Sequence, residues 1–190
     1  MRGNILKTKC GILRYSSQPH NHLLGDFHTD TKMQIRNADS DDYDQLVEYM
    51  LWVQDLHIQA LPDYYRCFDV NDAKSFLTKY SESKTSYIRV ADNKGNIVGV
   101  SFIEFYELGE TFLRKSRKFA YLDLLAVGSQ YQRSGVGSNM LRDAKNVAKS
   151  HGVTRIELDV MGLNEPARRF YISQGFSELA HRMYFEESIA

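Results

Sequence analysis

The apolar and polar positions of the chain fall into strand-like stretches from Met33 onward. Residues alternate from Met33 to Asn37, as along an exposed strand, and Phe119–Val127 is a longer and more apolar stretch. Between them, Tyr87–Ala91 and Ile97–Tyr106 are joined by the run D-N-K-G-N, which is typical of a β-hairpin. The pattern therefore predicts a first strand, a central hairpin and a further strand after it.

Helical spacing marks four other stretches. The first follows Asp39 or Ser40, either of which can cap a helix, and its apolar side chains recur at helical spacing through His57. The other three predicted helices are Asn71–Tyr80, Ser138–Ser150 and a segment from about Pro166 to Gly175. Gly152 and Gly175 stand after the last two, where a glycine commonly ends a helix.

The order of these elements predicts an α/β fold, with an α+β type of mixed sheet. Arg155–Met161 alternates as a strand between the last two helices, and Met183–Glu186 is a candidate closing strand. The resulting order, β-α-α-β-β-β-α-β-α-β, predicts a mixed sheet with helices on both faces. We assign one domain to residues 33–190 and expect residues 1–32, which show no sustained period, to be a poorly ordered extension.

Composition narrows the classes of function. The chain has 24 Lys and Arg and 24 Asp and Glu, so its charge does not indicate nucleic acid or an acidic membrane as a partner. It has no secretory-type apolar stretch at its start and no run near the roughly 20 residues of a spanning helix. Cys10 and Cys67 lack metal-ligand spacing, and His20, His22 and His28 lack acidic or cysteine partners nearby. We therefore expect a cytoplasmic protein with no bound metal.

The clearest chemistry lies in residues 131–138, Y-Q-R-S-G-V-G-S, between an apolar strand and a helix. Gly135 and Gly137 let backbone N–H groups approach a ligand, the helix start adds the positive end of its dipole, and Arg133 adds a full charge. Together these features suit a pyrophosphate. The alternative is a tight turn that needs glycine for its own backbone angles, with Arg133 in solvent.

Two motifs resemble those of a known family. Residues 132–137, Q-R-S-G-V-G, match the Q/R-x-x-G-x-G/A acyl-CoA motif of the GNAT superfamily of N-acetyltransferases, and the preceding Y-L-D-L-L-A-V is similar to its central strand. The later signature N-x-x-A-x-x-x-Y-x-x-x-G-F is matched by Asn164, Ala167, Tyr171, Gly175 and Phe176. The resemblance covers roughly residues 33–186 and implies the GNAT acyl-CoA N-acyltransferase fold, with acetyl-CoA as cosubstrate.

The resemblance also implies roles for single residues. One strand would offer backbone groups to the pantetheine arm of acetyl-CoA, the glycine loop would hold the pyrophosphate, and one asparagine would lie near the thioester. In this sequence these residues are Leu125, Ala126 and Val127, then Gln132, Arg133, Ser134, Gly135, Val136, Gly137 and Ser138, and finally Asn164. Tyr171 stands where the family has the acid that protonates the departing thiolate.

Several assignments have structural alternatives. Tyr171 is also placed to pack the last helix, and Asn164 to cap it. The attacking amine needs a base, and Asp123 is the first candidate because a carboxylate in an apolar strand is costly unless it is paired or functional. The alternatives are Glu104 on the neighbouring predicted strand, an ordered water chain, and a purely structural salt bridge.

The sequence thus predicts an acyltransferase that acetylates a primary amine of a small molecule or peptide. Residues 53–66 resemble the variable wall of the family's acceptor site, where His57, Tyr64 and Tyr65 are candidates, although His57 also lies on an apolar helix stripe. The competing function is a non-catalytic acyl-CoA-binding regulatory module. A dinucleotide site is disfavoured because Met140 replaces its third glycine. The acceptor and the oligomeric state stay open, with a homodimer as one candidate.

Overall fold

The computed structural model describes residues 33–185 and 187. The chain divides into two compact units, Met1–Leu158 and Asp159–Ala190, which we describe one at a time. The predicted extension, residues 1–32, lies outside the described residues, so the domain limits drawn from the sequence stay a prediction.

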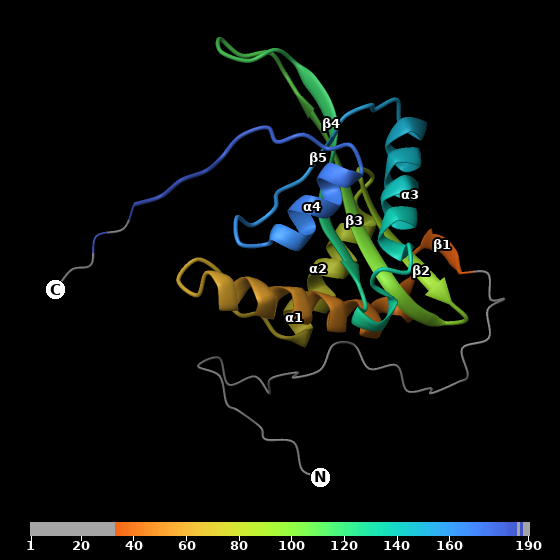
Figure 1. The fold of residues 1–190 in the computed structure, drawn as a ribbon. Helices are drawn as coiled ribbons and strands as arrows, with labels where there is room; N and C mark the ends of the chain where they lie inside the picture. The colour runs from red at the N-terminus through yellow and green to blue at the C-terminus, as the bar shows by residue number, and fades with distance from the viewer. Residues whose placement is uncertain (1–32, 186, 188–190) are drawn as a thin grey trace. The chain divides into compact units, whose positions relative to one another are not determined.

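A five-stranded sheet in the order β1-β2-β3-β4-β5 forms the centre of the first unit (Figure 1). Its strands are β1 (Gln34–Asn37), β2 (Ser86–Asn93), β3 (Asn96–Leu108), β4 (Arg117–Val127) and β5 (Ile156–Glu157). Neighbouring strands are antiparallel except β4 and β5, which run parallel. The predicted mixed sheet is therefore confirmed, including the hairpin between β2 and β3.

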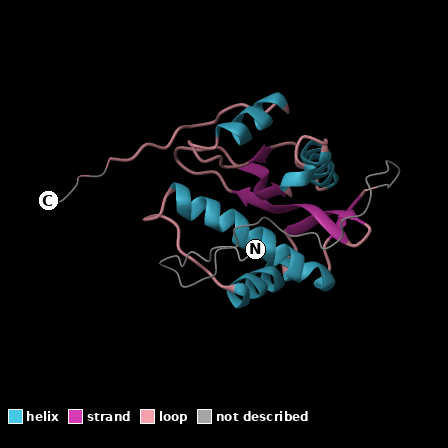
Figure 2. Cartoon of the chain, turned by 60° about the horizontal axis from the view of Figure 1, so that its bottom comes forward, coloured by secondary structure: helices cyan, strands magenta, loops and turns pink. Residues whose placement is uncertain are grey.

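Helices cover both faces of this sheet (Figure 2). In the first unit they are η1 (Ser40–Asp42) and η2 (Ser129–Tyr131), both short 3-10 helices, and α1 (Tyr43–Ala60), α2 (Val70–Glu82) and α3 (Val136–Ser150). The helices α1 and α2 pack with Val90, Val100 and Phe102 of the sheet. On the opposite face, α3 packs through Val136 and Met140. The predicted two-sided arrangement is confirmed.

Asp39 begins the helical segment that follows β1. Its side chain accepts a hydrogen bond from the N–H of Asp41 at 3.0 Å, and the Asp42 carboxylate accepts one from the N–H of Asp39 at 2.9 Å. Asp42 is buried, and both of its oxygens accept hydrogen bonds from Arg36, at 2.7 and 2.8 Å. Arg36 also donates to Asp92 of β2 at 3.0 Å. One arginine therefore ties the first strand to the helix start and to the hairpin.

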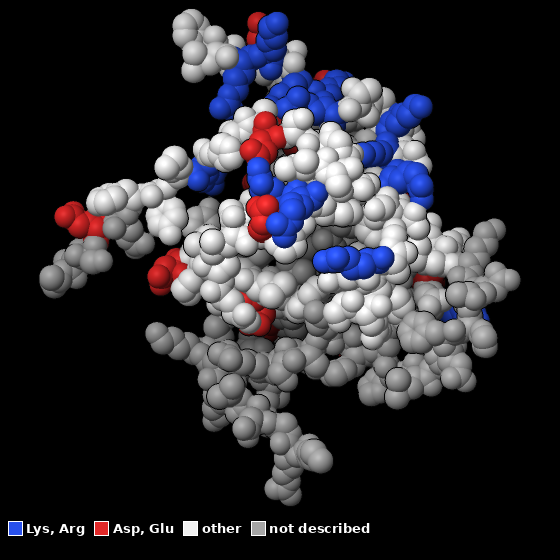
Figure 3. Space-filling view, in the orientation of Figure 1, with Lys and Arg blue, Asp and Glu red and all other residues white. Residues whose placement is uncertain are grey.

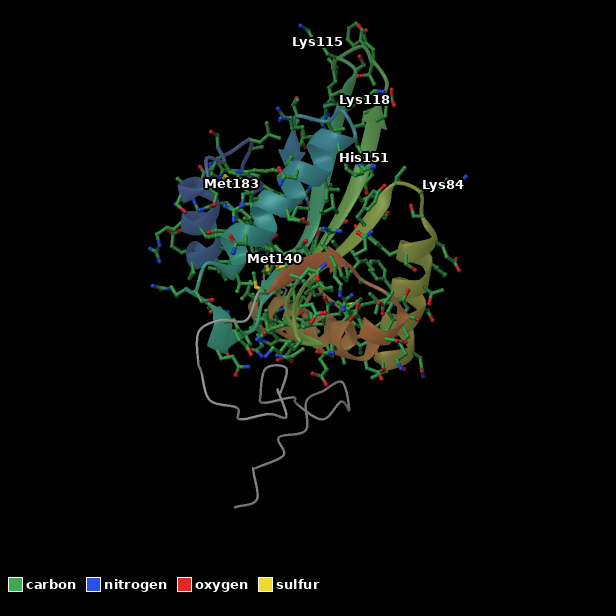
Figure 4. All side chains as sticks on the ribbon, turned by 90° about the vertical axis from the view of Figure 1, so that its right-hand side faces the viewer. Lys84, Lys115, Lys118, Met140, His151 and Met183 are labelled. Atoms are coloured by element: carbon green, nitrogen blue, oxygen red, sulfur yellow. The ribbon has the colours of Figure 1, made fainter. Side chains whose placement is uncertain are left out.

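The distance between α3 and the sheet is set at Gly99 of β3. A Cβ atom at this position would lie 2.6 Å from the sulfur of Met140, 3.2 Å from Cγ1 of Val136 and 3.3 Å from the carbonyl oxygen of Ala126. Met140 lies between α3 and the strands (Figure 4). Only glycine allows the first turn of α3 to come this close to the sheet.

The second unit contains α4 (Glu165–Ser173), which the sequence predicts. Gly175 follows it with φ of 88°, so its predicted role as a helix stop is confirmed. Two strand predictions fail. The strand expected over Arg155–Met161 is confined to the two residues of β5, and the expected closing strand is wrong in its described part, Met183–Phe185, which is exposed and forms no strand.

Candidate active site

An irregularity in β4 places Asp123. The register with β3 pairs Ile103 with Leu122 and Phe102 with Leu124, so Asp123 is an extra residue in β4. Such a β-bulge redirects the side chain of the inserted residue. Oδ2 of Asp123 accepts a hydrogen bond from the Tyr80 hydroxyl of α2 at 2.9 Å, so the carboxylate lies on the face of the sheet that α1 and α2 cover.

One edge of β4 is open beyond the bulge. β5 pairs with Ala120 and Tyr121 only, so in the described part of the chain no strand lies beside residues 122–127 on the edge turned away from β3. The predicted cofactor residues Leu125, Ala126 and Val127 belong to this stretch, and β3 pairs with their other edge. An open strand edge can hydrogen-bond to the amide groups of an extended ligand, as an added strand would.

A tight loop connects β4 to the start of α3. Gly135 caps α3 with φ of 89°, and Arg133 also has a positive φ, of 64°. A Cβ atom at Gly135 would meet nothing within 4 Å, so glycine is required here for the backbone angle, as the tight-turn alternative holds. The same geometry gives α3 no side-chain cap, which leaves the N–H groups of its first turn, at Val136, Gly137 and Ser138, available to an anion.

Two polar side chains brace this loop. The side-chain amide of Gln132 donates to the carbonyl oxygen of Val127 at 3.1 Å, and the hydroxyl of Ser134 donates to the backbone carbonyl oxygen of Tyr131 at 2.6 Å. The side chains of both residues thus hold the loop to itself and to the end of β4, while Arg133 is exposed. Gln132 and Ser134 therefore shape the loop, and their backbone groups stay the candidate ligand contacts.

Two carboxylates of the sheet are each bound to a tyrosine. Beside the Tyr80–Asp123 pair, the hydroxyl of Tyr106 donates to Oε2 of Glu104 at 2.7 Å. Partial desolvation raises the pKa of Asp123, the hydrogen bond from Tyr80 lowers it, and the charge of Glu104 raises it, so the net shift is upward. Neither carboxylate forms an ion pair with a described residue, so this part of the chain offers no partner for the structural salt bridge.

The three residues named for the predicted acceptor wall contact one another in the first unit. The rings of His57 and Tyr65 are stacked, with centroids 4.8 Å apart, and Tyr64 meets Tyr65 edge-on at 5.1 Å. Burial lowers the pKa of His57, which keeps its ring neutral at pH 7. His57 is half-buried, and this favours the packing interpretation of that residue. Tyr64 is 70% exposed and open to a ligand.

The second unit holds the other two predicted site residues, Asn164 and Tyr171. The side-chain oxygen of Asn164 accepts a hydrogen bond from the N–H of Ala167 at 3.2 Å, so it does cap α4. The ring of Tyr171 meets Phe170 and Phe176 edge-on, with centroids 5.2 and 5.5 Å away. Burial raises the pKa of Tyr171 to about 12, so its hydroxyl stays protonated at neutral pH, as an acid requires.

Sequence reasoning missed two residues that shape this site, Tyr80 and Gly99. The helical pattern treats Tyr80 as one more ring on the inner side of α2, although its hydroxyl reaches Asp123. A glycine inside a strand pattern is a weak indication of close backbone approach, and Gly99 is such a case. Both roles depend on contacts between elements that are distant in sequence.

Charge and metal chemistry add little to the site. Among the described residues there is no group of three or more His, Cys, Asp or Glu that could hold a metal ion, and no helix there is long and apolar enough to cross a bilayer. Lys and Arg gather at the end of the β3–β4 hairpin, which contains Arg114, Lys115 and Lys118 (Figure 3). Lys118 is paired with Glu107 at 2.9 Å.

Comparisons with known proteins agree on an acetyltransferase family. Residues 49–176 match the model of the Acetyltransferase (GNAT) family. The uncharacterized N-acetyltransferase YhfO of Bacillus subtilis (strain 168) is 30% identical over 116 residues, which are 60% of this chain and 74% of that protein.

Solved structures agree with this match. The tetramutant of the BH1408 protein from Bacillus halodurans superimposes with a TM-score of 0.76 at 26% identity, over 82% of this chain and 100% of that one. A predicted acetyltransferase of Clostridium acetobutylicum, solved with acetyl-CoA, has a TM-score of 0.61 at 17% identity, over 82% and 96% of the two chains, which shows a shared fold. The open strand edge, the glycine loop and the family match together show that this chain belongs to the GNAT family of acetyltransferases.

Proposed function

We propose that this protein transfers the acetyl group of acetyl-CoA to a primary amine. The observation that carries the proposal is the succession of three features within one unit: the open edge of β4, the braced loop that follows it, and the start of α3, which has no side-chain cap. A ligand with an amide-containing arm and a pyrophosphate matches this sequence of donors, because the strand edge suits the arm and the helix start suits the anion.

The binding residues follow from this arrangement. The backbone of Leu125, Ala126 and Val127 would hold the pantetheine arm. The N–H groups from Gln132 to Ser138 would hold the pyrophosphate, with the charge of Arg133 nearby. Asn164, whose side chain already caps α4, would contact the cosubstrate near its thioester.

Two side chains would move the protons. Bound acetyl-CoA supplies the acetyl group as an activated thioester. Asp123 accepts the proton that the amine loses, and the raised pKa of its carboxyl makes it a better base than an ordinary aspartate. Tyr171 donates a proton to the leaving thiolate, because its hydroxyl is protonated at neutral pH, although burial, which raises its pKa to about 12, also makes it a weaker acid than an ordinary tyrosine. A non-catalytic module would require neither residue.

Binding is the first test. Thermal unfolding is measured with and without acetyl-CoA, with NADH as the control ligand. At a ligand concentration about 100 times the dissociation constant, binding stabilises the folded state by about 2.7 kcal/mol. A shift with acetyl-CoA alone is expected, and a folded protein that shows no shift would contradict the proposal.

Turnover is the second test. A panel of amines, including polyamines, an aminoglycoside and a peptide, is screened by the release of free CoA thiol. With the best amine, Asp123→Asn should lower kcat/KM by about 10²–10⁴. Glu110→Gln is the matched control, because Glu110 is an exposed carboxylate of the hairpin. If Asp123→Asn keeps full activity while Glu104→Gln loses it, Glu104 is the base instead.

A further inference from the structure

The hydrogen bond between Tyr80 and Asp123 joins two elements of the first unit. It spans 2.9 Å and links α2 to the bulge of β4. Tyr80 is 8% exposed, and its ring packs on Phe76 and Phe102, with both centroids 5.3 Å away. Because Tyr80 is buried and its ring is packed against two other rings, its hydroxyl has a fixed position, and the carboxylate that it binds is fixed with it.

The hydrogen bond occupies only one carboxylate oxygen. Tyr80 donates to Oδ2, and Oδ1 accepts no hydrogen bond from any residue that the structure describes. Asp123 as a residue is solvent-accessible. Burial raises the pKa of Tyr80 far above its ordinary value, so its hydroxyl stays protonated and acts as a donor at any pH at which the enzyme would be assayed. One oxygen is thus anchored while the other is available to a proton.

The charges around Asp123 act in opposite directions. From α2, the Tyr80 hydrogen bond lowers the pKa of the Asp123 carboxyl, and from β3 the charge of Glu104 raises it. Glu104 is itself bound by Tyr106. On the other side of β4, Glu157 of β5 is neutralised by Arg117 at 3.1 Å and by Arg155 at 2.6 Å. Burial has the largest effect on the pKa of Asp123 and raises it, and Tyr80 and Glu104 are the side chains that then adjust this pKa.

We infer that Tyr80 is a positioning residue, whose hydroxyl holds Oδ2 of Asp123 so that Oδ1 takes the proton of the acceptor amine. This inference rests on the proposed function, in which Asp123 is the base. Tyr80 and Glu104 also adjust the pH range of the reaction in opposite directions, because the hydrogen bond from Tyr80 stabilises the charged carboxylate and the charge of Glu104 opposes it.

The first experiment needs no acceptor. The Asp123 carboxyl is titrated by ¹³C NMR in the wild type, Tyr80→Phe and Glu104→Gln. Tyr80→Phe keeps the packed ring and removes the hydroxyl, so the pKa of Asp123 should rise, whereas in Glu104→Gln it should fall. Tyr43→Phe is the control. It also removes a tyrosine hydroxyl that is hydrogen-bonded across to another element, because the hydroxyl of Tyr43 in α1 lies 2.8 Å from that of Ser81 in α2. It should leave the titration unchanged.

The second experiment follows kcat/KM against pH. The acid limb should move to higher pH in Tyr80→Phe and to lower pH in Glu104→Gln, and Tyr80→Phe should also lose about tenfold in its maximal kcat/KM. A Tyr80→Phe protein that melts at a lower temperature with an unchanged titration and pH profile would show that Tyr80 is merely structural, and would overturn the inference. If the NMR shifts are found but the wild-type protein transfers acetyl to no amine of the panel, the proposed function is refuted while the coupling of Tyr80 to Asp123 stands.

Discussion

Replacing Gly99 with alanine tests whether the approach of α3 to the sheet matters for stability and binding. The new Cβ would lie 2.6 Å from the sulfur of Met140, whereas ordinary contacts begin at 3.4 Å, so the two atoms must separate by 3.4 − 2.6 = 0.8 Å. Met140 is fully buried, and Val136 is also within 3.2 Å of the new atom. Overpacking of this kind costs about 1–3 kcal/mol. Alanine regains about 0.5–1 kcal/mol in a strand, and the midpoints of the two ranges leave a net loss of about 1 kcal/mol.

The variant is assayed by urea unfolding and by calorimetric titration with acetyl-CoA. Val136 is the first residue of α3, so its displacement moves the N–H groups that would hold the pyrophosphate. We expect a dissociation constant about 3–10 times higher, equivalent to about 0.7–1.4 kcal/mol. Gly109→Ala is the control, since a Cβ there meets nothing within 4 Å. Wild-type stability in Gly99→Ala would refute the packing argument, and lost stability with unchanged affinity would refute its link to binding.

Three further predictions concern other parts of the chain. Asp42→Asn removes the buried charged partner of Arg36, which keeps Asp92, and should cost about 1.5–3 kcal/mol at pH 7, the range for a hydrogen bond to a charged group. Burial would raise the pKa of Asp42, but the hydrogen bonds from Arg36 and from the N–H of Asp39 lower it on balance, so this stabilisation is present above about pH 4 and lost at lower pH. The urea unfolding curves of the wild type and Asp42→Asn should therefore converge below about pH 4. A difference in stability that stays constant with pH would contradict this reasoning. Gly135→Ala should destabilise by about 1–2 kcal/mol, because alanine must adopt the left-handed conformation, and calorimetry that finds no change would show that the loop relaxes freely. Tyr171→Phe should lower kcat by about 10²–10⁴, and steady-state assays that find full activity would assign the acid elsewhere.

Most of the fold follows from local patterns. The alternation in β1, the hairpin turn before β3 and the cap at Asp39 each depend on residues that are close in sequence, and the structure has all three. The predicted strand over Arg155–Met161 is mostly absent for the opposite reason. A strand needs a partner, and within Arg155–Met161 only Ile156 and Glu157 pair with β4, which alternation cannot reveal.

In the candidate site, too, the local motif was predictable from the sequence and the contact between distant elements was not. The glycine loop is a local motif, and its conformation at Gly135 agrees with the pattern. The partner of Asp123 lies 43 residues away on another element, and the carboxylate reaches it only because β4 is bulged at that residue. A bulge is a property of the register between two strands, so it leaves no mark on either strand's sequence alone.

The features of the proposed reaction in the first unit share one strand. At Ala120 and Tyr121, before the bulge, β4 is paired on both edges. At the bulge it presents Asp123 to Tyr80, and after the bulge it has one open edge that leads into the loop of α3. The proposed base and the proposed binding edge are therefore held a few residues apart by the same backbone, with no hinge between them. Because a shift of one residue turns each side chain of a strand to the other face, a deletion within β4 would lose the base and the binding edge together, whereas a change in the exposed hairpin should lose neither.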